Sequence, residues 1–180
     1  MNSALQKLRD LAENSDGEYG FAGGTSSDDL DSISNEFGVT LPTDYRQFLI
    51  ETGGEAPNSD GLCGGYQFLG VEEIRSTHME WCGYAQAEFA SLRTTTWYLG
   101  ETAFYEPTWF PIAAIRQREL IMLATDHTRC CVFEWDVESG AGAIYAYGFS
   151  MMINRIVDSL LDEGYVEMID SLEPLRKNAE

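Results

Sequence analysis

The sequence predicts an α+β domain: a central, mainly antiparallel sheet of five to six strands, flanked by N- and C-terminal helices. Three observations support this class. Apolar residues recur at helical spacing early in the chain, short apolar runs separated by turn residues begin at residue 109, and a strongly amphipathic segment follows residue 150. With 180 residues and 44% hydrophobic content, the chain can bury one core, so we expect a single domain over residues 1–180.

Two helices are predicted before residue 38. Ser3 and Gln6 have capping-box spacing, and the leucines that follow favour a helix over residues 4–14. A loop rich in Gly, Ser and Asp comes next. Ser26 or Ser27 is expected to cap the second helix, because a hydroxyl there can accept a hydrogen bond from a free helical N–H group.

A third helix is predicted after a short apolar link. Gly38 ends the second helix, and Pro42 suits the first turn of the next one, where no N–H donor is needed. Asp44 follows in that turn, where a carboxylate meets the positive end of the helix dipole. Gly53 and Gly54 supply the left-handed residue that ends such a helix.

The remainder of the chain is expected to supply the sheet and the last helices. The predicted strands cover residues 66–69, 110–115, 120–124, 131–136 and 143–147, with a hairpin loop at 136–142. Helices are predicted at 71–80 and 85–92, with strand or irregular structure at 94–98. An amphipathic helix runs from Met152 to Gly164, and a last helical piece follows at 166–172.

The pattern of residues in the strand at 131–136 predicts a surface that could bind a partner protein. Alternate residues of a strand share a face, so one side carries Cys131, Phe133 and Trp135 and the other carries Val132, Glu134 and Asp136. We expect the second side to face water or a partner, beside Glu138 in the following loop. Preorganised carboxylates there could meet the lysines and arginines of a basic protein, although a merely solvated strand face fits the same pattern.

Other candidate contacts lie elsewhere in the chain. Glu72 and Glu73 form a second acidic pair, which could serve a partner or simply be solvated. Trp81, Tyr84 and Tyr98 could act as aromatic anchors for a partner, or belong to the core.

The charge narrows the classes of partner. Eleven basic and thirty acidic residues give a net charge of −19, which repels nucleic acid and anionic membranes and suits a basic protein partner. We find no apolar run near the roughly 18 residues that span a bilayer, and no basic segment with an apolar core at the start. We therefore expect a cytoplasmic protein with reduced cysteines.

Metal and catalytic alternatives have weaker support. His78 and Cys82 lie four residues apart on a predicted helix and could share a metal ion, and His127 and Cys130 form a second loose pair. The run Gly23 to Ser26 precedes a helix and could cradle an anion, but it lacks the lysine of a phosphate-binding loop. No nucleophile motif is present, so we expect neither an enzyme nor a cofactor.

Several motifs occur in the order found in a known family. They are a helix ending at Phe37–Gly38, the pair Leu41–Pro42, the helix Tyr45-Arg46-Gln47-Phe48-Leu49, the Gly53–Gly54 stop, the run Phe68-Leu69-Gly70-Val71-Glu72-Glu73-Ile74, the strand entry Trp109-Phe110-Pro111-Ile112-Ala113, Asp126 after an apolar strand, and Ser150-Met151-Met152 at the last helix. In this order the chain resembles the SUKH superfamily over residues 28–163, with its terminal helices as additions. The segment from residue 78 to residue 108 carries no family motif.

The resemblance implies a function that composition only permits. SUKH proteins include bacterial immunity proteins of polymorphic toxin systems and a fungal regulator of cell-wall synthesis. The expected function is therefore an immunity protein that binds a cognate toxin, such as a nuclease, and covers its active surface. An intracellular regulatory or scaffold module of the same fold is the alternative, and a small metal protein or enzyme is the third.

Overall fold

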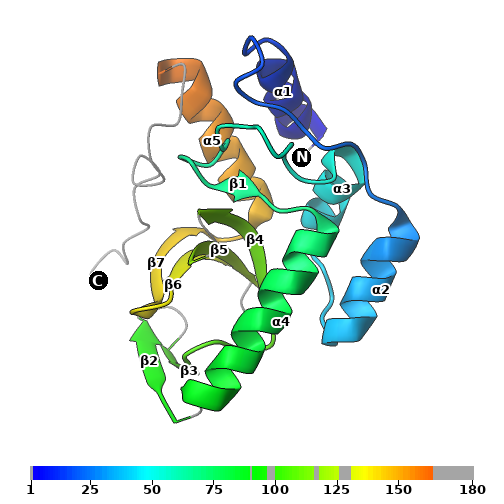
Figure 1. Ribbon diagram of the computed structural model, residues 1–180. Coiled ribbons are helices and arrows are strands. Elements are labelled where there is room, and N and C mark those ends of the chain that lie inside the picture. Colours follow the sequence, from blue (N-terminus) through cyan, green and yellow to red (C-terminus); the bar gives the residue numbers. More distant parts are fainter. Residues whose placement is uncertain (1, 90, 97–99, 116–117, 126–130, 164–180) are drawn as a thin grey trace.

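The computed structural model describes residues 2–89, 91–96, 100–115, 118–125 and 131–163 (Figure 1). In this part of the chain the helices are α1 (Asn2–Glu13), α2 (Ser27–Phe37), α3 (Thr43–Thr52), α4 (Val71–Glu88) and α5 (Phe149–Glu163). The strands are β1 (Gln67–Phe68), β2 (Arg93–Thr96), β3 (Gly100–Ala103), β4 (Trp109–Ile115), β5 (Glu119–Ala124), β6 (Val132–Asp136) and β7 (Gly140–Ala146). None of these helices is both long and apolar enough to cross a membrane.

A five-stranded antiparallel sheet forms the centre of the molecule. Its order is β1-β4-β5-β6-β7, and a separate two-stranded sheet pairs β2 with β3. Short connections join β4, β5, β6 and β7, which places consecutive strands side by side and antiparallel. The α+β class with its antiparallel sheet and flanking helices is therefore confirmed.

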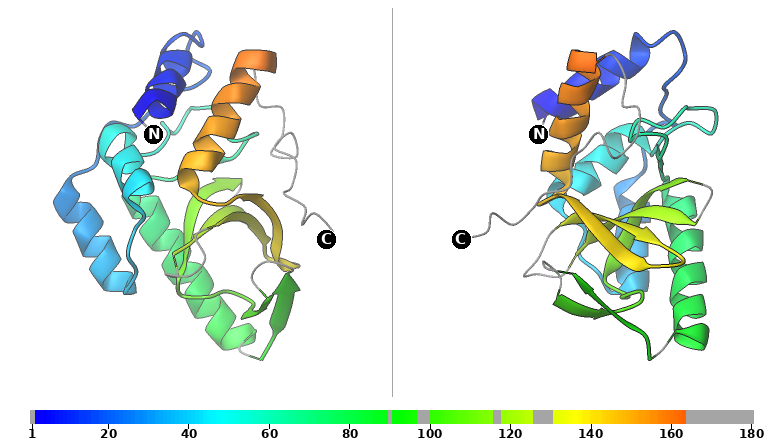
Figure 2. Two further views of the ribbon diagram at one scale, coloured as in Figure 1. Left: turned by 180° about the vertical axis from the view of Figure 1, so that it is seen from behind. Right: turned by 90° about the vertical axis from the view of Figure 1, so that its left-hand side faces the viewer.

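Both faces of the sheet are buried. Helices α3 and α5 pack on one side, with α1 lying against α5, and the later turns of α4 cover the other side, as the two views in Figure 2 show. The buried side chains form two hydrophobic clusters: the first lies on the side of α3 and α5, and the second on the side of the later turns of α4. Along β5, Ile121 and Leu123 belong to the first cluster, whereas Leu120 and Met122 belong to the second. A strand buried on both faces reads as a continuous apolar run, which explains the segment ELIMLA.

The open strand face expected on β6 is only partly open. Val132 is fully buried beneath the first cluster, so the prediction is wrong for this end of the strand. Glu134 and Asp136 are half-buried at the other end, beyond the helical cover. The side chains of β6 alternate between the two faces as expected. That helices would cover Val132 could not be predicted from the residues of the strand itself.

Three element boundaries differ from expectation for identifiable reasons. Pro42 is the residue before α3 rather than part of its first turn. Helix α4 is continuous to Glu88, because Trp81 and Ala85 are buried on one side while Gly83 faces open space. Strand β7 begins at Gly140, inside the predicted loop, because the Asp136 carboxylate closes a tight turn by accepting hydrogen bonds from the next residues.

A carboxylate from α3 caps the distant helix α5. Asp44 Oδ2 accepts hydrogen bonds from the Ser150 backbone N–H at 2.8 Å and from its hydroxyl at 2.6 Å. Beside this contact the rings of Tyr45 and Phe149 pack at 4.9 Å between centroids. Asp44 therefore meets the dipole of α5 as well as that of its own helix, joining segments 106 residues apart.

A second buried carboxylate covers the outer edge of β1. Glu55 is 5% exposed, and its backbone N–H donates to the Phe68 carbonyl at 2.8 Å. Its Oε1 accepts from the Phe68 N–H at 2.9 Å, so Glu55 takes the place of a neighbouring strand. The same carboxylate accepts from the Ser59 hydroxyl at 2.5 Å and from the Leu62 N–H at 3.1 Å, which holds the loop after α3 against β1.

Replacing Asp44 tests the cap. Asp44→Ala should lower the free energy of unfolding by about 2 kcal/mol, because α5 loses its cap and a charged hydrogen-bond acceptor. Ser150→Ala should cost about 1 kcal/mol. The double variant should cost clearly less than the sum in urea unfolding, since both changes remove the same contact. Asp158→Ala, on the exposed side of α5, is the control. Strict additivity would argue against the cap.

Glu55 should make stability depend on pH. Desolvation by burial raises the pKa of Glu55 to about 7, against hydrogen bonds that lower it. The folded state then holds this proton more tightly than the unfolded chain does, so stability is highest at low pH and falls between about pH 4.5 and 7. The loss attributable to Glu55 is on the order of 3 kcal/mol.

The Glu55→Gln variant isolates this term, because the amide can keep the acceptor for Phe68 without ionising. Urea unfolding at pH 5 and pH 8 should show a smaller decrease for this variant than for the unmodified chain. Glu13→Gln, an exposed change of equal charge, should leave the pH dependence unaltered. Parallel profiles for the chain and Glu55→Gln would contradict the assignment.

Candidate functional site

The predicted partner-binding carboxylates fall into two separate groups. Glu134, Asp136 and Glu138 come together with Glu119 and Arg118 around a hollow of about 360 Å³ at the β6–β7 turn. Sequence reasoning missed Glu119. The pairing of Glu119 with Asp136 across β5 and β6 brings it there, and this register is a property of the folded sheet.

Much of the negative charge at this first hollow already has partners. Asp136 accepts hydrogen bonds from the backbone N–H groups of Glu138 at 2.7 Å and Ser139 at 2.8 Å, and from the Ser139 hydroxyl. Partial burial would raise its pKa, but these hydrogen bonds hold the pKa of Asp136 below its usual value. Glu134 accepts from the Tyr145 hydroxyl at 3.3 Å. Asp136 is thus first a turn-forming residue.

The second group lies where α2 and α4 begin. A hollow of about 610 Å³ is lined by residues from three segments, 22–29, 53–57 and 70–73. We call it the α2–α4 groove. Asp29, Glu55, Glu72 and Glu73 line it, and among the described lining residues there is no lysine, arginine or histidine. The groove is therefore the more uniformly acidic of the two sites.

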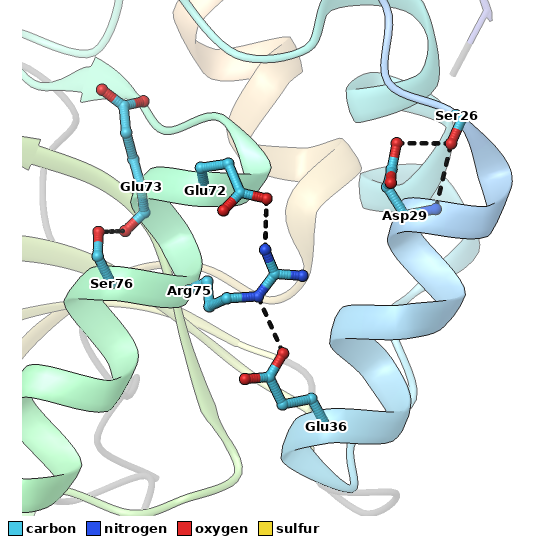
Figure 3. A network of polar contacts seen from close by, with 7 residues as sticks. All are labelled: Ser26, Asp29, Glu36, Glu72, Glu73, Arg75 and Ser76. Atoms are coloured by element: carbon cyan, nitrogen blue, oxygen red, sulfur yellow. Dashed lines mark hydrogen bonds and ion pairs between the residues drawn. The ribbon is translucent and has the colours of Figure 1, made fainter.

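Glu72 and Glu73 have different roles in this groove (Figure 3). Glu72 forms an ion pair with Arg75, whose Nε also contacts Glu36 Oε2 of α2 at 2.9 Å. Glu73 points away from Arg75, and its carboxylate accepts from the Gly70 N–H at 2.8 Å. The ion pairs connect the two helices, while Glu73 is left facing the groove.

Side chains of the chain itself occupy the helix ends that could have held an anion. The Ser26 hydroxyl accepts from the Asp29 N–H at 3.2 Å and donates to the Asp29 carboxylate at 2.6 Å. At α4 the Glu73 carboxylate accepts from the backbone N–H of Gly70, the residue before the helix. Carboxylates next to these N–H groups repel a phosphate, so the groove suits a cation better than an anion.

Glycines set the shape of the groove. Gly53 has φ 67°, and a side chain there would overlap the Gly23 carbonyl oxygen. At Gly54, with φ 92°, a side chain would meet the backbone of Leu69 and Gly70. The three segments around the groove therefore touch backbone to backbone, which fixes their spacing.

The histidine and cysteine considered as a possible metal-binding pair do meet. His78 Nε2 lies 3.5 Å from Cys82 Sγ, and His78 Nδ1 lies 3.1 Å from the Tyr105 hydroxyl. Desolvation lowers the pKa of His78 to about 4 and raises the pKa of Cys82 to about 11, so both are neutral near pH 7. This pair supplies neither a thiolate nor an imidazolium.

No third ligand joins them among the described residues, where no group of three or more His, Cys, Asp or Glu residues could hold a metal ion. His127 and Cys130 lie outside the described part of the chain. His78, Cys82 and Tyr105 therefore form a hydrogen-bonded cluster.

The aromatic anchors divide between core and surface. Trp81 is buried and packs against Trp135, with ring centroids 4.9 Å apart, so it belongs to the core. Tyr84 is 41% exposed on α4 and stays a candidate contact. Tyr98 lies outside the described residues.

Comparison with known proteins identifies the family. The model of the SMI1 / KNR4 family (SUKH-1) matches residues 24–155, which run from the groove segment before α2 through the sheet to the first turns of α5. Helix α1 and the rest of α5 lie outside the match. The comparison with curated proteins found no significant match to the chain. Because the match covers most of the sequence, the chain belongs to the SMI1 / KNR4 family (SUKH-1).

Proposed function

We propose that this protein is a cytoplasmic immunity protein that binds a cognate toxin and neutralises it without a catalytic step. The observation that carries the proposal is a rigid scaffold of the SMI1 / KNR4 family with two carboxylate-lined hollows and a net charge of −19. The protein would cover the active surface of the toxin in a one-to-one complex.

The charge distribution suits this mechanism. Both hollows are held by secondary structure, so their carboxylates are in place before the partner arrives. A strongly acidic surface attracts a basic partner over several ångströms and accelerates encounter. A nuclease toxin fits, because an enzyme that binds nucleic acid carries a basic cleft.

A regulatory or scaffold module is the second candidate. The matched family takes its name from SMI1 and KNR4. A regulatory or scaffold module of this fold would bind an intracellular protein without neutralising a toxin. The same acidic hollows would serve that contact. The two candidates differ in whether binding abolishes a toxic activity.

Coexpression separates these candidates. The toxin domain encoded next to the gene of this chain should arrest growth when expressed alone, and coexpression with the chain should restore growth. The purified proteins should form a one-to-one complex whose association rate falls about tenfold or more between 50 and 500 mM salt, because screening weakens charge steering.

Two double variants of equal charge locate the contact. Glu119→Gln with Glu138→Gln removes two exposed carboxylates from the hollow at the β6–β7 turn, whereas Asp158→Asn with Asp162→Asn removes two from α5. The first pair should slow association more than the second if that hollow takes part. Persistent toxicity together with the absence of a complex would reject the pairing with that toxin.

A further inference from the structure

We propose that a small hollow beside β1 receives one lysine side chain of the partner protein, as the anchor of the contact. The hollow has a volume of about 170 Å³ and shares Glu55, Pro57 and Glu73 with the α2–α4 groove, so it is a side chamber of that groove. This inference rests on the proposed function, and it specifies which chemical group the groove selects.

A buried hydroxyl in this hollow lacks a partner. Thr77 lines the hollow and is 6% exposed, and its side chain makes no hydrogen bond with any described residue. The Tyr45 hydroxyl is the single unpartnered side-chain oxygen that is sealed from solvent in the described part of the chain. The Thr77 oxygen is therefore not sealed from solvent, and Thr77 is one of the residues that line the hollow.

Two further acceptors line the same hollow. Gln67 donates its amide nitrogen to the Ser59 carbonyl, which leaves its amide oxygen without a partner among the described residues. Glu73 uses one carboxylate oxygen for the Gly70 N–H and keeps the other available. A hydroxyl, an amide oxygen and a carboxylate oxygen together match the three N–H donors of an ammonium group.

The walls of the hollow favour a lysine over a free cation. Pro57, Leu69 and Ala114 offer apolar surface to the four-carbon stem of a lysine, whose charged end would reach the acceptors. The described residues include no set of three carboxylate, histidine or cysteine ligands for a metal ion. A compact ammonium also suits a hollow much smaller than the groove into which it opens.

Nuclear magnetic resonance can test this inference without the toxin. The ¹⁵N-labelled chain is titrated with the peptide acetyl-GGKGG-amide, and in parallel with the same peptide carrying acetyl-lysine or norleucine. Saturable shifts are expected at the amides of Gly70, Glu73 and Thr77 with the lysine peptide alone. Shifts centred on Glu119 and Glu138, or equal shifts with all three peptides, would overturn the inference.

Thr77→Val is the sharpest variant, because it replaces the hydroxyl with a methyl group of the same shape. It should weaken binding of the lysine peptide by about tenfold, through loss of one acceptor for a charged donor. The free energy of unfolding should not fall, since the hydroxyl has no partner to lose. Unchanged affinity in a folded Thr77→Val variant would overturn the inference.

Glu73→Gln and Glu72→Gln form a matched pair. They remove equal charge from adjacent residues, but only Glu73 lines the hollow, while Glu72 is paired with Arg75. Glu73→Gln should weaken peptide binding at least fivefold more than Glu72→Gln, and equal effects would contradict the lysine site. Toxin neutralisation that survives Thr77→Val and Glu73→Gln would leave the proposed function standing and reject this pocket. Selective binding of the lysine peptide without any toxin complex would support the lysine pocket and reject the proposed function.

Discussion

The structure depends on a point where three stretches of backbone touch at Gly53 and Gly54. Helix α3 ends there in a left-handed conformation, and no side chain fits between it and the Gly23 carbonyl or the Leu69–Gly70 backbone. Four backbone hydrogen bonds tie residues 20–25 to residues 49–56 alongside this contact. The next residue, Glu55, then attaches the same junction to the edge of β1.

This junction connects the fold to its function. It sets the distance between the first turns of α2 and α4. Arg75 of α4 also forms an ion pair with Glu36 in the last turn of α2, while its second partner, Glu72, lies on α4 itself. Both sheet faces are used for packing, so the surface available to a partner lies at helix ends and turns. The acidic groove is accordingly rigid, and a partner would meet carboxylates already in place.

The features that could be predicted from the sequence are those that depend on residues close together in the chain, namely the helix ends and the apolar strands. Ser26, Gly38 and Gly53 marked the helix ends correctly because caps and left-handed stops depend on neighbours within a few residues. The strands from Trp109 onward were visible through their apolar runs. Strand β7 was predicted to begin three residues too late, since residues 140–142 have low strand propensity and their pairing with β6 depends on a bulge.

Features made by distant residues were not predictable. Glu55 reads as one acid in a polar loop, and only folding places Phe68 and Leu62 against it. Asp44 was understood as a dipole partner of its own helix, and its bond to Ser150 required the tertiary fold. The candidate residues Glu72 and Glu73 were identified without the groove around them, and Thr77 carried no signal, because an unpartnered hydroxyl is invisible in a sequence.

Hydrogen–deuterium exchange of the chain, free and in complex with a toxin domain that it neutralises in coexpression, tests the central claim most directly. If the acidic groove is the binding surface, residues 22–29, 53–57 and 70–77 should gain the most protection, and the buried strands β4 and β5 should change little. Protection confined to α1 and α5, with these three segments unchanged, would contradict the account.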